Sequence, residues 1–218
     1  MSLSAIIVSY RTGPILSECL SALIAADECD EIIVVDNGNA SEEELTLNKF
    51  ALTNANVRLL RGHGNIGFSA GCNMGAVHAT GDSLLFVNPD VVLAKGAATR
   101  MVNALDVLPS PAIVGGDLRD PQGRPDRGSR RDRVTPWRAF VSFSGLSRFG
   151  RWIGPCRDLH RHEDPAVPSE ACPVGAVSGA LMMVRKSDFD MVGGFDEEYF
   201  LHVEDVDLCR RIEEAGGR

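Results

Sequence analysis

The chain has 218 residues, of which 44% are hydrophobic, and its formal net charge is −8 at pH 7. This length predicts one large domain with a sizeable core, and the negative charge argues against general nucleic-acid binding. The sequence contains no run of 18 or more apolar residues, so no membrane-spanning segment is expected.

Cysteine usage and the first residues bear on the compartment. The six cysteines are scattered and form no C-x-x-C pair, which disfavours a zinc site and a disulfide framework. Met1 is followed by an apolar run without a basic region or a cleavage site, so we expect no secretory signal. Reduced thiols in a cytoplasmic protein fit these features best.

The first third of the chain alternates strand and helix patterns. Strands are predicted at 4–9, 31–35 and 57–60, and helices at 14–26 and from Ser41 onward. The strands are continuously apolar, which is typical of strands buried on both faces. The βαβαβ order therefore predicts a doubly wound, mostly parallel sheet with helices on both faces.

A glycine-rich stretch follows at 62–75 and contains G-x-G-x-x-G. In a dinucleotide-binding fold this motif follows the first strand, whereas here it follows the third, which disfavours a nicotinamide cofactor. Asn65 and Asn73 flank an expected helix start, where free N–H groups favour a diphosphate, and Gly67 lets the backbone approach a ligand. The alternative is a glycine-rich turn chosen for packing.

The strand at 84–88 runs directly into Asn88-Pro89-Asp90. Asn88 precedes proline and is pushed out of the α region, so the chain turns at the carboxyl end of a central strand, where α/β sheets bind ligands. The oxygen atoms of Asn88 and Asp90 suit Mg²⁺ or Mn²⁺. Alternatively, Asp90 caps the following helix.

The second half is less regular. A helix is predicted at 94–108, strands at 112–116 and 181–184, a short helix from Ser187, and a last helix through Arg211. Residues 119–161 hold 11 Arg and 4 Asp, a local charge of +7. We interpret 119–172 as an insertion or acceptor-side loop between a nucleotide-binding half, 1–118, and a catalytic half, 173–218.

Trp137, Phe140, Phe143, Trp152 and Ile153 lie within this basic segment. Basic residues near anionic lipid are attracted to it, and aromatic side chains seat at its interface. We therefore expect peripheral contact with the inner membrane face through 119–161, with a solvated loop as the alternative.

Acidic residues stand at three predicted element ends. Asp36 ends the second strand, Asp90 follows the fourth, and Glu204-Asp205 begin the last helix. The first two share the carboxyl edge of a parallel sheet. Taken alone, Glu204 and Asp205 are equally explained as helix N-terminal acids stabilised by the dipole.

Four motifs occur in order: 32–39 (IIVVDNGN), 64–73 (GNIGFSAGCN), 86–90 (FVNPD), and 193–197 (GGFDE) with 204–208 (EDVDL). Together they resemble glycosyltransferase family 2, most closely its rhamnosyltransferase-type members, over nearly the whole chain outside 119–172. The resemblance implies a GT-A fold, a nucleotide-diphospho-sugar donor, a divalent metal (Mg²⁺ or Mn²⁺), and inversion at the anomeric carbon.

The resemblance also implies residue roles. Asp205 of the Glu-Asp motif, with Glu204 beside it, would be the general base. Asn88-Pro89-Asp90 stands where the family has Asp-x-Asp, so Asp90 would carry most of the metal binding. Asp36 and Asn37 match the acidic pair that meets the base and ribose, and Asn37 replaces an Asp, which leaves uracil and thymine open. The loop that holds the nucleotide matches Ser9, Tyr10 and Arg11.

We therefore expect a glycosyltransferase that moves a sugar from dTDP-rhamnose or a UDP-sugar to a saccharide or lipid-linked saccharide in cell-surface polysaccharide synthesis. A nicotinamide-dependent oxidoreductase and a non-catalytic sugar-nucleotide-binding module are the alternatives. Family members normally continue beyond the helix that carries Asp205, so we expect a chain truncated at its C-terminus. Donor sugar, linkage and oligomeric state stay open.

Overall fold

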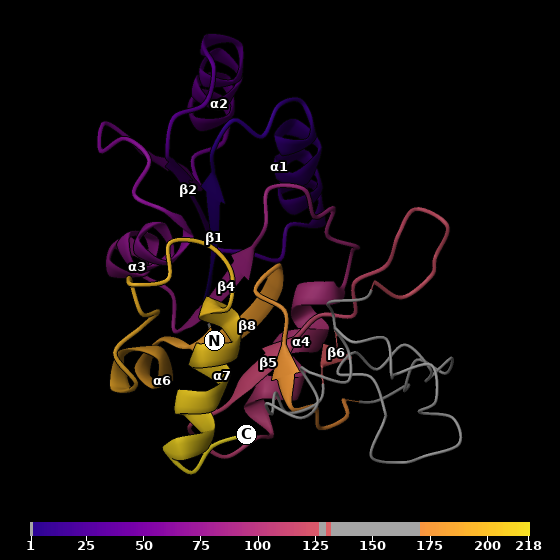
Figure 1. Cartoon of the computed structure of the whole chain (residues 1–218). Helices are drawn as coiled ribbons and strands as arrows, with labels where there is room; N and C mark the ends of the chain where they lie inside the picture. The colour runs from indigo at the N-terminus through magenta and orange to yellow at the C-terminus, as the bar shows by residue number, and fades with distance from the viewer. Residues whose placement is uncertain (1, 127–129, 132–170) are drawn as a thin grey trace, which may run out of the picture.

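A computed structural model describes residues 2–126, 130–131 and 171–218 (Figure 1). Most of the expected insertion at 119–172 lies outside the described residues. So do all five of the aromatic and apolar residues expected to contact a membrane. Among the described residues, no helix is long and apolar enough to cross a bilayer.

Four neighbouring strands of a six-stranded sheet are parallel. They are β1 (Leu3–Ser9), β2 (Glu31–Asp36), β3 (Val57–Leu60) and β4 (Ser83–Val87), arranged in the order β3-β2-β1-β4. All seven residues of β1 are buried, as expected for a central strand covered on both faces. In register, Ser9 of β1 lies opposite Asp36 of β2, so both residues reach the same edge.

The remaining two strands are joined to the sheet by antiparallel pairing. β8 (Leu181–Arg185) pairs with β4 on one side and with β5 (Ile113–Gly115) on the other. Consequently the segment that precedes β8 arrives at the same edge as the chain leaving β4. The backbone N–H of Asn88 donates to the carbonyl of Ala180 there, at 2.9 Å.

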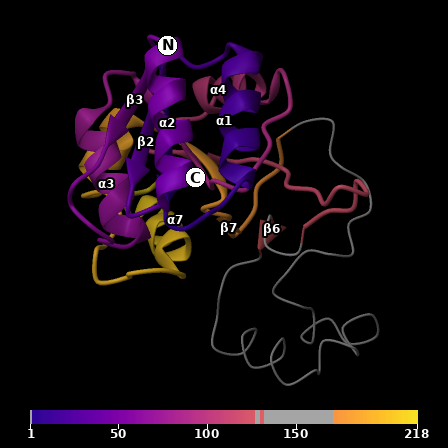
Figure 2. The ribbon, with the colours of Figure 1, turned by 90° about the horizontal axis from the view of Figure 1, so that it is seen from above.

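Helices cover both faces of the sheet. One face carries α1 (Ile15–Ala26), α2 (Ser41–Thr53) and α4 (Ala97–Asp106), and the other carries α3 (Phe68–His78), α6 (Lys186–Met191) and α7 (Glu204–Glu214). Figure 2 shows α1 and α4 together, apart from α3 and α7. Gly75 lets α3 approach β1 closely, because an added Cβ would lie 2.5 Å from Ile6.

The starts of α2 and α4 differ from the prediction. The cap of α2 is Ala40, which has no side-chain hydrogen bond, so Ser41 is the first helical residue and does not cap the helix. α4 begins at Ala97, three residues later than expected, because the Glu28 carboxylate accepts hydrogen bonds from Ala98 and Thr99 and caps that turn. α3 begins at Phe68, between Asn65 and Asn73 as expected, and Asn73 lies in its second turn.

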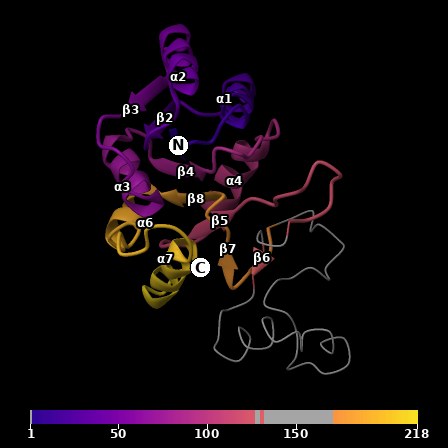
Figure 3. The same cartoon turned by 45° about the horizontal axis from the view of Figure 1, so that its top comes forward.

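A small second sheet was not predicted. β6 (Arg130–Arg131) pairs antiparallel with β7 (Ala176–Val177), and β7 lies between β6 and α7 (Figure 3). Two-residue strands have too little periodicity to be detected in a sequence. This sheet brings Arg131 next to Asp205 at the start of α7.

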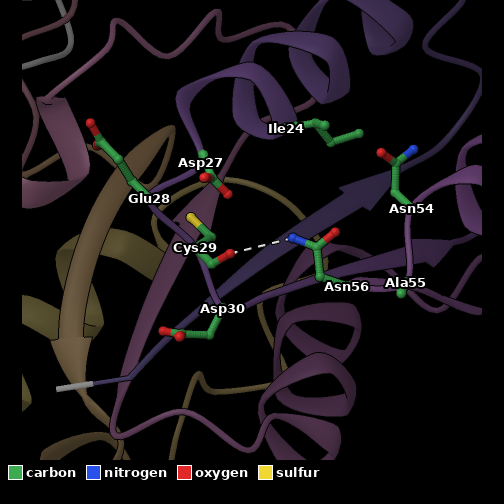
Figure 4. Close-up of a pocket in the computed structure, with 8 residues that line it drawn as sticks. All are labelled: Ile24, Asp27, Glu28, Cys29, Asp30, Asn54, Ala55 and Asn56. Carbon is green, nitrogen blue, oxygen red and sulfur yellow. Dashed lines mark hydrogen bonds between the residues drawn. The ribbon is translucent and has the colours of Figure 1, made fainter.

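A hollow of about 550 Å³ lies at the opposite, amino edge of the sheet (Figure 4). Two of its three acids hold neighbouring elements: Glu28 caps α4, and Asp30 accepts the Leu3 N–H at 2.7 Å. Burial, together with Glu28 and Asp30, raises the pKa of Cys29 to about 12. These residues therefore join elements and do not form a reactive centre.

Candidate active site

A cleft of about 780 Å³ opens at the carboxyl edge of the parallel strands. The loops after β1, β2 and β4 form one side, and the segment before β8 with the start of α7 forms the other. It is lined by Val8, Tyr10, Thr12, Ile15, Asn37, Asn65, Gly67, Phe68, Asn88, Pro89, Asp90, Arg131, Ser178, Gly179, Ala180, Phe200, Leu201, His202, Val203, Glu204 and Asp205.

Most of the predicted site residues meet in this cleft. Those that line it are Tyr10, Asn37, Asn65, Gly67, Asn88, Asp90, Glu204 and Asp205, whereas Ser9, Arg11, Asp36 and Asn73 are not among its lining residues. The sheet order explains the meeting, since the carboxyl ends of β1, β2 and β4 lie at one edge.

Asp36 organises the turn after β2. Its side chain is buried, and Oδ1 accepts hydrogen bonds from the backbone N–H of Gly38 (3.1 Å) and Asn39 (3.0 Å) and from Asn39 Nδ2 (2.8 Å). Asn39 Oδ1 in turn accepts the Ser9 hydroxyl at 3.0 Å. Asp36 and Ser9 thus fix the loops that carry Asn37 and Tyr10.

Asn37 joins that turn to the glycine-rich loop. Its Nδ2 donates to the Gly67 carbonyl at 2.9 Å, and its Oδ1 lies 3.0 Å from His63 Nε2. An amide oxygen can only accept, so His63 carries its proton on Nε2. Asn65 Oδ1 accepts the N–H of Gly67 at 3.1 Å, which closes the loop on itself.

Gly67 cannot be replaced without strain. Its φ is +88°, and an added Cβ would lie 2.8 Å from both the ring and the carbonyl oxygen of Phe200. The Phe200 carbonyl accepts the N–H of Phe68, the first residue of α3, at 2.8 Å. The loop before α7 therefore closes over the start of α3, and Phe200 becomes part of the cleft wall.

Asn73 of α3 also binds the segment that precedes α7. Its Nδ2 donates to the Phe195 carbonyl at 2.8 Å and to Glu197 Oε1 at 2.9 Å, while its Oδ1 accepts the Phe195 N–H at 2.9 Å. With three bonds to one loop, the side chain is directed away from the cleft. Asn73 therefore positions the chain that leads into α7.

Tyr10 and Arg11 follow β1. The Tyr10 ring is half exposed in the cleft, and the Arg11 guanidinium carbon lies 5.3 Å from its centroid. Such a contact is a cation–π interaction. Tyr10 can offer a flat face to a nucleotide base, whereas Arg11 stacks on the ring.

Asn88 and Asp90 lie where β4 ends. The Asp90 side chain is exposed, and the Asn88 backbone is fixed by Ala180 and by the Val91 N–H at 3.0 Å. The described residues contain no cluster of three His, Cys, Asp or Glu side chains that could chelate a cation. Magnesium typically takes one or two carboxylates and completes its shell with substrate phosphates and water, so an accessible Asp90 with the Asn88 amide fits this donor set.

Asp205 lies at the start of α7 and is buried. Oδ2 accepts the Gly179 N–H at 3.0 Å, and Oδ1 accepts the Val206 N–H at 2.8 Å. Arg131 Nη1 donates to both oxygens, at 3.2 and 3.3 Å. A side chain at Gly179 would be crowded here, since its Cβ would lie 3.3 Å from that of Asp205.

Glu204 is the second buried carboxyl of this wall. It is 7% exposed, and its Oε2 has no hydrogen-bond partner among the described residues. Burial raises the pKa of Glu204 above its ordinary value, and the neighbouring Asp205 carboxylate raises it further. The two adjacent acids therefore have different environments, which is typical of pairs with different roles.

Sequence reasoning missed Arg131, Gly179 and Phe200. Arg131 was included only in a compositional bias, which gives no position to any one arginine. Gly179 follows Ser178 directly before a strand, a signal that could have indicated a close backbone approach. Phe200 carried no pattern at all, because its role depends on the loop that Asn73 holds.

Comparisons with known proteins identify the family of this chain. Residues 4–162 match the family model described as Glycosyl transferase family 2. An N-acetylglucosaminyl-diphospho-decaprenol L-rhamnosyltransferase of Mycobacterium tuberculosis is 30% identical over 98% of this chain and 71% of its own length. The rhamnosyltransferase WbbL of Escherichia coli strain K12 is 28% identical over 98% of this chain and 77% of its own.

The crystal structure of GalNAc-T7 with UDP, GalNAc and Mn²⁺ superimposes with a TM-score of 0.72 at 16% identity, over 100% of this chain. This chain spans 41% of that structure's length. Such a likeness speaks for the fold alone, and it confirms the predicted GT-A fold. With a family model matched over most of its length and a cleft at the expected edge of the sheet, the chain belongs to glycosyl transferase family 2.

Proposed function

We propose that the chain transfers a sugar from a nucleotide-diphospho-sugar to an acceptor hydroxyl, with inversion at the anomeric carbon, in the synthesis of a cell-surface polysaccharide. One observation carries this proposal: a single cleft has an accessible carboxylate, Asp90, on one wall and a buried, firmly oriented carboxylate, Asp205, on the other. The first suits a metal-bound diphosphate and the second suits proton removal.

The donor is proposed to be dTDP-rhamnose or a UDP-sugar. Tyr10 and Asn37 form the wall that would receive the base and ribose. Two of the relatives described above are named as rhamnosyltransferases. The Mycobacterium relative is named for an acceptor that links N-acetylglucosamine through a diphosphate to decaprenol. An acceptor of this class, a saccharide on a prenyl diphosphate, is our proposal for this chain.

Asp90 and Asn88 would hold the divalent cation. When bound, Mg²⁺ or Mn²⁺ neutralises negative charge on the departing diphosphate. The chain's own contribution at this wall is to keep the Asn88 backbone fixed against Ala180, so that the Asp90 side chain stays at the mouth of the cleft.

Asp205 is proposed to take the proton from the acceptor hydroxyl. The acceptor oxygen forms its bond to the anomeric carbon as the bond to the diphosphate breaks, and the proton passes to the Asp205 carboxylate. Attack opposite the leaving group inverts the carbon and needs no covalent enzyme intermediate. Gly179 and Val206 hold the carboxylate in place during this step.

Glu204 would accompany the base without sharing its role. Its Oε2, which has no hydrogen-bond partner among the described residues, can pair with a sugar hydroxyl of a bound substrate. Burial raises the pKa of Glu204 above its ordinary value, so this carboxyl holds a proton more readily than it would in water.

The test is a transfer assay with dTDP-rhamnose and UDP-sugars, in the presence of Mn²⁺ or Mg²⁺ and a short prenyl-diphosphate N-acetylglucosamine. We expect release of nucleoside diphosphate that depends on the acceptor, and a product of inverted anomeric configuration by NMR. Retention of configuration would refute the inverting mechanism. Binding of NAD, with no release from any nucleotide sugar, would favour the oxidoreductase alternative.

A further inference from the structure

Hydrogen-bond donors from the described residues already reach both carboxylate oxygens of Asp205. An ionised carboxylate offers about four lone-pair positions. Four hydrogen bonds from described residues already reach Asp205: one from the Gly179 N–H, one from the Val206 N–H, and two from Arg131 Nη1. An acceptor hydroxyl needs one of these positions, so one donor must leave before the proposed base can act.

Only one of these donors is free to move. The Gly179 and Val206 groups belong to the backbone, and the Val206 N–H is among the first of α7. The Arg131 guanidinium ends a flexible side chain that is 22% exposed, and its two contacts with Asp205 are the longest of the four, at 3.2 and 3.3 Å. Arg131 is therefore the donor that can be exchanged.

The cleft also contains a reason for the exchange. Of the described residues that line it, Arg131 is the single permanently charged cation, alongside three acids, Asp90, Glu204 and Asp205. A diphosphate brings two or more negative charges into the same space. Arginine binds phosphate through several parallel N–H groups, whereas here Nη1 alone reaches Asp205 and the buried Nε has no partner among the described residues.

We propose that Arg131 is a diphosphate-binding residue, which leaves Asp205 when the diphosphate of a bound substrate enters the cleft and so frees the general base only in the loaded enzyme. This inference rests on the proposed function and extends it to a residue outside the family motifs described above. The diphosphate can come from the nucleotide donor or from a prenyl-diphosphate acceptor, and both present the same oxygen atoms.

The test is a double-mutant cycle on binding. Dissociation constants for dTDP and UDP, each with Mn²⁺, and for farnesyl diphosphate are measured by calorimetry on wild type, Arg131→Gln, Asp205→Asn and the double variant. Arg131→Gln should weaken the relevant diphosphate by roughly ten- to a hundredfold, since hydrogen bonds between charged groups are lost. Thymidine and uridine, which lack phosphate, should bind all four chains alike.

Asp205→Asn supplies the decisive comparison. The substitution removes the carboxylate that competes for Arg131, so it should tighten diphosphate binding when Arg131 is present. In the Arg131→Gln background the gain in affinity should be smaller by a factor of at least about three. An equal gain in both backgrounds is a general charge effect and would overturn the proposal. A loss of affinity in Asp205→Asn would also overturn it.

Control variants distinguish a folding defect from a loss of binding, and the choice of ligand shows which substrate supplies the diphosphate. Arg131→Lys keeps the charge and should retain part of the diphosphate affinity. Arg210→Gln removes an arginine of α7 that lies outside the cleft and pairs with Asp207. It should leave all the measured dissociation constants unchanged. Coupling seen with dTDP or UDP assigns the donor diphosphate, and coupling seen with farnesyl diphosphate assigns the acceptor. Sugar transfer without coupling would refute this inference alone, and coupling without transfer would refute the proposed function alone.

Discussion

The two sides of the cleft hold their buried carboxylates in different ways. Asp36, behind the nucleotide-side loops, is bonded by groups two and three residues away, Gly38 and Asn39. Asp205, on the opposite wall, is bonded by the adjacent Val206 N–H and also by Gly179 and Arg131, which are 26 and 74 residues away. Local neutral donors make a fixed loop, whereas a distant arginine makes a contact that a ligand can exchange. The first arrangement shapes the site, and the second leaves a charge available for chemistry.

Replacing Asp205 by Asn should have the largest effect. The amide keeps the shape but cannot take a proton, so kcat should fall by roughly two to four orders of magnitude in the transfer assay, while the donor dissociation constant does not rise. The matched control is Asp207→Asn on the same helix turn, whose partners are Arg210 and Arg211. It should lower thermal stability and leave kcat nearly unchanged. A similar loss of kcat in both variants would assign Asp205 to helix structure.

Asp36→Ala tests the local side of the comparison. It leaves the buried Asn39 side chain and two backbone N–H groups without their acceptor, so the free energy of unfolding should fall by about 2 kcal/mol. For a chain of this size, that corresponds to a melting temperature lower by roughly 4–8 °C. Asp36→Asn keeps an acceptor oxygen and should lose less. An unchanged melting temperature in Asp36→Ala would show that the hydrogen bonds to Asp36 do not stabilise the turn after β2.

Asp90→Ala tests whether the nucleotide side depends on a cation. Nucleoside diphosphate affinity measured with Mn²⁺ should drop at least about tenfold, and the difference between assays with and without Mn²⁺ should disappear. Asp82→Ala is the control, because Asp82 lies at the other end of β4 and contacts Ser2. If the Mn²⁺ dependence persists in Asp90→Ala, another residue must supply the ligand.

Glu204→Gln should have the smallest effect, and its sign depends on pH. Because burial raises the pKa of Glu204 in the folded chain, the protonated form is favoured by folding. That stability is complete below the unfolded pKa of about 4.3 and is lost as pH rises through the raised folded pKa. Gln cannot ionise, so the melting temperature of the variant relative to wild type should rise with pH above this value. A difference that is independent of pH would mean that Glu204 is not in a dry environment.

Local patterns determined much of this protein. Runs of apolar residues located β1, β2 and β4, because strands buried on both faces are mostly apolar at their centres. The turn after β2 was visible as Asp36-Asn37-Gly38-Asn39, since its hydrogen bonds close within three residues. The order of motifs indicated the family, and the family model agrees.

Tertiary structure decided what those patterns could not. Asn65 and Asn73 were expected to flank a helix start, and α3 begins between them, but only the folded chain shows that Asn73 holds the loop leading to α7. Arg131 meets Asp205 because β6 pairs with β7, and β7 packs against α7. A sequence pattern records interactions between near neighbours, while contacts across 74 or 122 residues depend on how the strands and helices pack together. The exchangeable charge at the proposed base belongs to this second kind.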